Sequence, residues 1–162
     1  MGEPSDDLGL VLVTGASGYI GSHIVANLLS KGREVRATVR DASDPERVDH
    51  LISMETSEGG NLEIVEMDLL DEDSVNRAVS GCKSVIHTAA VVILKSKRPQ
   101  EKIVDPSVIG TKNVLDAIDA SGTVKQLVHT SSTAAIRPQK WEDGQILTTE
   151  TWADDATIGN NP

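Results

Sequence analysis

Near its N-terminus the chain reads Leu10-Val11-Leu12-Val13-Thr14-Gly15-Ala16-Ser17-Gly18-Tyr19-Ile20-Gly21. The apolar run 10–13 is typical of a buried strand, and Ile20, Ile24 and Leu28 follow the glycines at helical spacing. Glycines at such a turn permit a tight bend, close approach of a pyrophosphate and close packing of helix on strand. The stretch therefore predicts a strand–turn–helix unit that binds a dinucleotide. Its candidate contacts are Thr14, Gly15, Ser17, Gly18, Tyr19, Ile20 and Gly21.

The same alternation of apolar runs and amphipathic stretches continues to about residue 135. Strands are predicted at residues 8–14, 34–40, 62–67, 84–88 and 126–131. Helices are predicted after the glycine turn and at about 44–56, 71–80 and 104–120, the last carrying Val108, Val114, Leu115 and Ile118. The near-continuous apolar character of the strands indicates burial on both faces, as in a parallel sheet covered by helices. We therefore predict an α/β fold, a Rossmann-type doubly wound parallel sheet with strand order 3-2-1-4-5.

The pattern of strands and helices stops after Ala135. A chain of 162 residues is the size of one ordinary domain, so residues 1–135 are expected to form one NAD(P)-binding domain. Residues 136–162 are predicted to be an acidic loop region. Because the edge of a sheet is normally covered, the sequence is expected to be truncated before the last strands and a substrate domain.

The composition excludes several classes of function. A net charge of −10 disfavours binding to nucleic acid or to an anionic membrane, and no apolar run approaches the roughly 20 residues of a membrane span. The single Cys82 and an N-terminus without a signal-peptide pattern favour the cytoplasm. The histidines lack ligand spacing, so no metal site is predicted. They are His23, His50, His87 and His129.

Two arginines lie at and after the end of the second predicted strand, where a protein selects between NADP and NAD. A protein that prefers NAD places an acid there for the ribose hydroxyl. Arg40 instead favours the 2′-phosphate of NADP, and Arg47 could close a clamp on it. Solvated surface charge is the alternative for both, and Asp41 could serve NAD. The sequence thus predicts NADP, with NAD less favoured.

Other candidate residues follow the third, fourth and fifth strands, where ligands of open α/β sheets bind. Asp68, with Leu69 beside it, could accept a hydrogen bond from adenine, or cap a helix. The small residues Thr88, Ala89 and Ala90 would let the cofactor cross the sheet edge. His87 is interpreted as a packed strand residue rather than a catalytic one. After the fifth strand, the hydroxyl-bearing residues that could bind the cofactor or a substrate carbonyl are Thr130, Ser131, Ser132 and Thr133.

Taken in order, these segments resemble the extended short-chain dehydrogenase/reductases, and within them the dihydroflavonol reductase and cinnamoyl-CoA reductase-like group. The resemblance covers nearly all of the chain. It rests on residues 13–21, Arg36-Ala37-Thr38-Val39-Arg40-Asp41, Asp68-Leu69, Gly110-Thr111-Lys112-Asn113-Val114-Leu115 and Thr130-Ser131-Ser132.

The resemblance implies NADPH-dependent reduction of a ketone or aldehyde, in which a serine and a tyrosine bind the carbonyl oxygen and a lysine lowers the tyrosine pKa. The serine corresponds to Ser132, with Ser131 and Thr133 as near alternatives. The sequence contains no Tyr-x-x-x-Lys motif, because Tyr19 is its only tyrosine and His23 stands four residues later. Since such proton transfer contributes a factor of about 10² to 10⁴, negligible activity is expected.

Two alternatives remain open at this point. One is a non-catalytic NADP-binding or sensing module that never had the tyrosine. The other is the cofactor half of a sugar epimerase or dehydratase, or of a hydroxysteroid dehydrogenase. The expected partner is a small carbonyl or alcohol substrate, and the sequence does not predict an oligomeric state.

Overall fold

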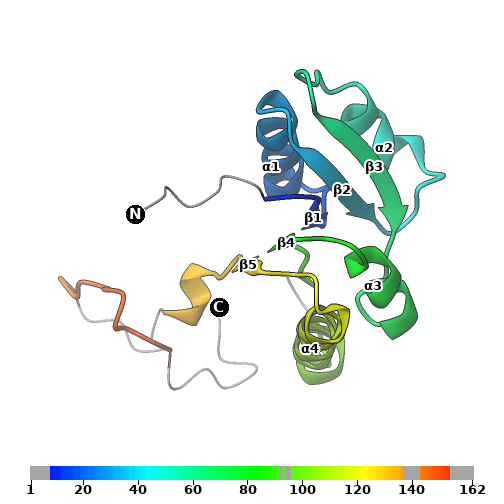
Figure 1. The fold of residues 1–162 in the computed structure, drawn as a ribbon. Helices are drawn as coiled ribbons and strands as arrows, with labels where there is room; N and C mark the ends of the chain where they lie inside the picture. The colour runs from blue at the N-terminus through cyan, green and yellow to red at the C-terminus, as the bar shows by residue number, and fades with distance from the viewer. Residues whose placement is uncertain (1–7, 92, 94–95, 137–142, 154–162) are drawn as a thin grey trace.

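The computed structural model describes residues 8–91, 93, 96–136 and 143–153. These residues form a five-stranded sheet in which all neighbouring strands are parallel, in the order β3-β2-β1-β4-β5 (Figure 1). The fold class and the strand order predicted from the sequence are both confirmed. The strands are β1 (Val11–Thr14), β2 (Glu34–Val39), β3 (Asn61–Glu66), β4 (Ser84–His87) and β5 (Gln126–His129).

The helices lie on both sides of this sheet, with α1 and α2 on one side and α3 and α4 on the other (Figure 1). A π-helical turn, η1, leads directly into α4, and a short 3-10 helix, η2, follows β5. Within the described ranges, no helix is long and apolar enough to cross a membrane. The helices are α1 (Tyr19–Ser30), α2 (Pro45–Ile52), α3 (Glu72–Val79), η1 (Gln100–Val104), α4 (Asp105–Ser121) and η2 (Thr133–Ala135).

Alternate residues of β1 supply the two cores. Val11 and Val13 pack with the α1 and α2 residues, whereas Leu12 packs with those of α3 and α4. Burial on both faces is thus confirmed for β1, the central strand. It is wrong for β3, which alternates between exposed and half-buried residues, and for β5, whose four residues are all exposed. Both are edge strands of the described sheet, and an edge position depends on topology rather than on local sequence.

The packed side of α4 agrees only in part with the apolar pattern expected from the sequence: Val114 is buried and Ile118 packs against the same core, and the other buried residues are Gly110, Asn113 and Ala117. A Cβ added to Gly110 would lie 2.9 Å from the Leu69 Cβ, so α4 packs closely on the turn that follows β3. Val108 and Leu115, predicted to belong to the packed pattern, are instead 62% and 44% exposed.

Candidate dinucleotide-binding site

The glycine loop joins β1 to α1 at the carboxyl edge of the sheet. Gly15 has a left-handed backbone, with φ of +67°, and a Cβ added to it would lie 2.9 Å from the Ala89 Cα. Thr38 of β2 holds the loop from the other side, because its Oγ1 accepts from the Gly15 N–H at 3.3 Å and its carbonyl from the Ala16 N–H at 3.0 Å. The loop is therefore fixed between β2 and the residues that follow β4.

The first turn of α1 lacks a cap. Gly18 at the N-cap position has no side chain to accept a hydrogen bond, and the first turn contains no acidic residue. The N–H groups of Ser17, Tyr19 and Ile20 have no acceptor within the described part of the chain. The Asp44 and Asp71 carboxylates, by contrast, accept from N–H groups at the starts of α2 and α3. The start of α1 thus presents N–H donors and the positive end of the helix dipole to an anion.

Two further glycines have different reasons to be glycine. A Cβ added to Gly21 would collide with the Gly15 carbonyl oxygen and lie 2.9 Å from the Ala16 Cα, so close packing of α1 on the loop excludes a side chain. A Cβ added to Gly18 would meet only the Gly15 oxygen, at 3.3 Å. The space around Gly18 is otherwise open, and this residue is the N-cap of α1, directly before the uncapped Tyr19 N–H. The loop therefore combines close packing of its backbone on α1 at Gly21 with open space at Gly18.

The residues proposed to select between NADP and NAD lie just after β2. Arg40 is exposed. The competing Asp41 is engaged in a turn, where its Oδ1 accepts from the Ser43 hydroxyl at 2.7 Å and from the Ser43 N–H at 2.9 Å. These bonds lower the pKa of the Asp41 carboxyl. Arg47 makes an ion pair with Asp44, the α2 cap, at 2.9 Å, so Arg40 is the better placed of the two cations.

Asp68 lies in the turn between β3 and α3, and its Oδ1 accepts from the Leu70 N–H at 2.9 Å. The alternative that it caps a helix is wrong, because Asp71 is the residue whose carboxylate accepts from the N–H groups that begin α3. The same turn is held by α4, since the Asn113 side-chain amide donates to the Leu69 carbonyl at 2.8 Å. Asp68 is thus held at the carboxyl edge, on the β3 side of the glycine loop.

The residues after β4 are bound to the end of β1. Thr14 Oγ1 lies 2.7 Å from His87 Nδ1 and accepts from the N–H groups of Thr88 and Ala89, each at 3.1 Å. The Thr88 hydroxyl donates to the Thr14 carbonyl at 2.6 Å. Thr14 is completely buried. The Thr14 side chain therefore joins β1 to β4, and any contribution of Thr14 to a cofactor site is indirect. Ala90, by contrast, is exposed at the carboxyl edge of the sheet, where a cofactor could contact it.

His87 is packed inside the sheet, as the sequence predicts, and is 2% exposed. Burial, with a smaller contribution from the nearby His129, lowers the pKa of His87 to about 4. The two imidazole rings have their centres 5.1 Å apart. Within the described residues, His87 Nε2 is a buried atom without a hydrogen-bond partner. The ring is therefore neutral at physiological pH.

Ser132 and Thr130 follow β5 at the same carboxyl edge, and both are exposed. The Ser132 Oγ accepts from the Ala134 N–H at 3.2 Å and caps η2, which leaves its hydroxyl proton available to another acceptor. Thr130 is tied to β4, because its N–H donates to the His87 carbonyl at 3.0 Å. Part of the predicted acidic region, residues 137–142 and 154–162, lies outside the described residues.

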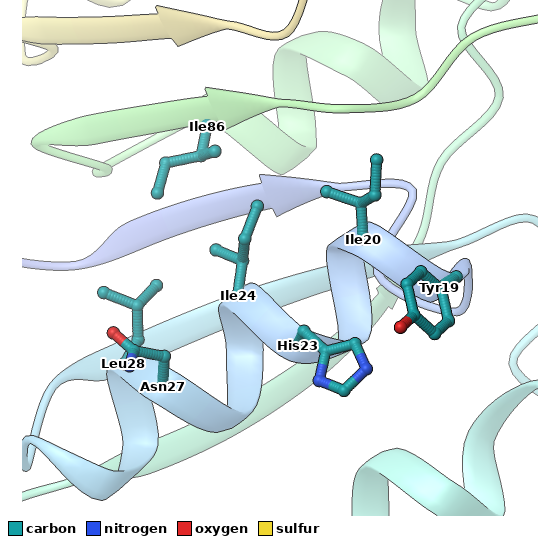
Figure 2. Close-up of a pocket in the computed structure, with 7 residues that line it drawn as sticks. All are labelled: Tyr19, Ile20, His23, Ile24, Asn27, Leu28 and Ile86. Atoms are coloured by element: carbon teal, nitrogen blue, oxygen red, sulfur yellow. The ribbon is translucent and has the colours of Figure 1, made fainter.

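An apolar hollow of about 530 Å³ lies on the flank of α1, between this helix and Ile86 of β4. Figure 2 shows Ile24 and Leu28 of α1 directed toward Ile86 of β4. Of the predicted cofactor contacts, only Tyr19 and Ile20 line this hollow. It is a mainly apolar surface beside the sheet whose polar side chains are those of Tyr19, His23 and Asn27, and its lining offers no lysine or arginine to a phosphate.

Sequence reasoning did not assign roles to Thr38 and to the pairing of Thr14 with His87. Thr14 and His87 are opposite each other in the registered strands β1 and β4. A polar residue at the last buried position of two adjacent strands is the signal that could have identified them. Thr38 gives a weaker signal, since a threonine is ordinary in a strand.

Comparison with known proteins finds relatives that are reductases. The cinnamoyl-CoA reductase CAD2 of Medicago truncatula is 42% identical over 154 residues, which are 94% of this chain and 47% of that protein. The bifunctional dihydroflavonol 4-reductase/flavanone 4-reductase of Malus domestica is 36% identical, over 95% of this chain and 43% of its own length. The chain thus spans less than half the length of these curated relatives.

A solved structure agrees with the sequence relatives. Yeast methylglyoxal/isovaleraldehyde reductase Gre2, complexed with NADPH, superposes with a TM-score of 0.77 at 26% identity, covering 93% of this chain and 45% of that one. The resemblance to the dihydroflavonol and cinnamoyl-CoA reductases seen in the sequence is confirmed. Residues 12–160 match the 3-beta hydroxysteroid dehydrogenase/isomerase family. The chain belongs to that family.

Proposed function

We propose that this chain binds NADP(H) and is the cofactor half of an oxidoreductase that reduces a ketone or aldehyde to an alcohol. The observation that carries the proposal is the uncapped start of α1, where the N–H groups of Ser17, Tyr19 and Ile20 have no acceptor in the described chain. A bound pyrophosphate would supply the missing acceptors. The nicotinamide of the bound cofactor would supply the hydride. The N–H groups of Ser17, Tyr19 and Ile20 would bind the pyrophosphate and so orient the cofactor.

The preference for NADP rests on the residues after β2. The exposed Arg40 guanidinium offers a fork of donors suited to a 2′-phosphate. The acid that would favour NAD, Asp41, already accepts two hydrogen bonds from Ser43. The reductases among its relatives support the same choice, since Gre2 was solved with NADPH.

Replacing Arg40 by alanine tests this choice. Since a hydrogen bond to a charged group contributes roughly 1.5–3 kcal/mol, we expect NADPH to bind Arg40→Ala at least about tenfold more weakly, with NADH affinity unchanged. Isothermal titration calorimetry measures both. The matched control is Arg98→Ala, which removes an exposed arginine that precedes η1 and pairs with Glu101. Equal NADPH affinity in Arg40→Ala and wild type would contradict the clamp.

The substrate oxygen is assigned to Ser132, whose hydroxyl proton is available at the carboxyl edge. The chain has no Tyr-x-x-x-Lys motif to complete the proton transfer, and such a transfer contributes a factor of about 10² to 10⁴ to the rate. We therefore expect no measurable NADPH oxidation when the chain alone is mixed with simple ketones and aldehydes, followed by the absorbance of NADPH. Turnover by the chain that Ser132→Ala abolishes would contradict this expectation.

A further inference from the structure

A buried polar cluster joins the glycine loop to the residues after β4. We call it the Thr14 cluster, and it consists of the Thr14 hydroxyl, the His87 imidazole and the N–H groups of Thr88 and Ala89. Its distances are 2.7 Å from Thr14 Oγ1 to His87 Nδ1 and 3.1 Å from the same oxygen to each N–H. Both side chains are almost completely buried, so water does not compete for these bonds.

The bonds of the cluster determine where each proton lies. A threonine hydroxyl has one proton to donate and two lone pairs that accept. The N–H groups of Thr88 and Ala89 occupy both lone pairs of Thr14, so the hydroxyl proton must be donated to His87 Nδ1. That nitrogen is therefore unprotonated and the ring proton is on Nε2. His87 is thus the group that orients the Thr14 hydroxyl toward the two amides.

The cluster sets the separation between two backbone segments at the proposed cofactor site. One is the glycine loop, which follows Thr14 directly, and the other is residues 88–90. Ala89 packs so closely on Gly15 that a Cβ on Gly15 would lie 2.9 Å from the Ala89 Cα. A shift of either segment changes the path that a dinucleotide follows across the sheet edge.

Resting on the proposed NADP(H) binding, we propose that His87 is a positioning residue for the cofactor. By accepting the Thr14 proton, it holds the amides of Thr88 and Ala89 against the glycine loop. It does not contact the cofactor itself, because it is buried within the sheet. Two groups face the His87 ring: the titratable imidazole of His129 on β5 and the hydroxyl of Thr14 on β1. The cluster works only with a proton acceptor at the Nδ1 position.

Two substitutions of His87 separate positioning from packing. Leucine fills the space but accepts no proton, whereas the Oδ1 of asparagine can accept one near the position of Nδ1. We expect His87→Leu to bind NADPH about tenfold more weakly, because it leaves a buried donor unsatisfied. His87→Asn should return to within about twofold of wild type. Calorimetric titration at a temperature well below unfolding measures both.

A double-mutant cycle tests whether His87 acts through Thr14. Thr14→Val should weaken NADPH binding as much as His87→Leu, and the double variant should lose little more, because both changes remove the same bond. Thr14→Ser, which keeps the hydroxyl, is the matched control. Wild-type affinity in His87→Leu would overturn the proposal. So would His87→Asn binding as weakly as His87→Leu, or losses that simply add.

Amide hydrogen exchange of Thr88 and Ala89 gives a readout without cofactor. The two amides should exchange about tenfold faster in His87→Leu than in wild type and His87→Asn. If wild type fails to bind NADPH, the proposed function is wrong and these rates still decide the cluster. Unchanged exchange in His87→Leu would overturn the positioning role even if NADPH binds.

Discussion

Gly21→Ala is expected to lower the free energy of unfolding by about 3 kcal/mol, at the upper end of what overpacking costs. The new methyl group would collide with the Gly15 carbonyl oxygen and press on the Ala16 Cα. Both are backbone atoms of a loop that Thr38 already holds in place, so neither can move aside cheaply. Urea unfolding followed by circular dichroism measures the loss.

Gly18→Ala is the matched control, because it adds the same methyl group to the same loop. Gly18 has φ of −80°, which alanine adopts without strain, and its Cβ would meet only one atom, at 3.3 Å. We expect its stability to stay within about 1 kcal/mol of wild type. If Gly21→Ala proved as stable as Gly18→Ala, the packing role assigned to Gly21 would be wrong.

Acidification from pH 6.5 to 4 is expected to cost about 3 kcal/mol of stability through His87 alone. Burial lowers the pKa of His87 to about 4 in the folded chain, whereas an unfolded histidine has a pKa of about 6.5. Between pH 6.5 and 4 the His87 imidazole therefore binds a proton in the unfolded chain and stays largely unprotonated in the folded chain. The stabilisation is complete above pH 6.5, falls as the pH drops toward 4 and then levels off.

Comparison with His87→Asn isolates this contribution from that of the carboxylates. Unfolding free energies measured at several pH values should fall less steeply for His87→Asn than for wild type between pH 6.5 and 4. His50→Asn serves as the control, because it removes an exposed histidine from the last turn of α2. Parallel pH profiles for wild type and His87→Asn would show that His87 is not buried in its neutral form.

The parts of the fold that depend on local pattern could be predicted from the sequence. The apolar run 10–13 and the glycines after it identify β1 and α1, and Asp71 and Gly122 mark where α3 begins and α4 ends. The burial of β5 and the orientation of α4 could not be predicted in this way. Both depend on which elements lie beside them, and the apolar Val108 does not differ locally from a core residue.

The candidate site likewise has residues that could be assigned from local pattern and residues whose contacts depend on three-dimensional packing. Gly15 and Gly21 could be assigned because the backbone there excludes a side chain, and this need is visible in the residue type itself. Thr14 was expected to contact the cofactor, but its side chain is turned into the sheet toward His87. Arg47 could close a clamp on the 2′-phosphate, which stays a prediction, and the structure pairs its Nε with Asp44 at 2.9 Å. Contacts between neighbouring strands, and the choice of ion-pair partner, are set by three-dimensional packing.

Titration of NADPH into wild type and Gly18→Ala tests the central claim, that the start of α1 holds a dinucleotide, most directly. The alanine methyl group would leave the fold intact, and a pyrophosphate bound at the N-cap of α1 would have to approach the backbone at this residue, where glycine permits the closest contact. We predict saturable binding to wild type and binding at least about tenfold weaker to Gly18→Ala, with equal unfolding temperatures. Equal affinity in the two proteins, or no binding to folded wild type, would contradict the claim.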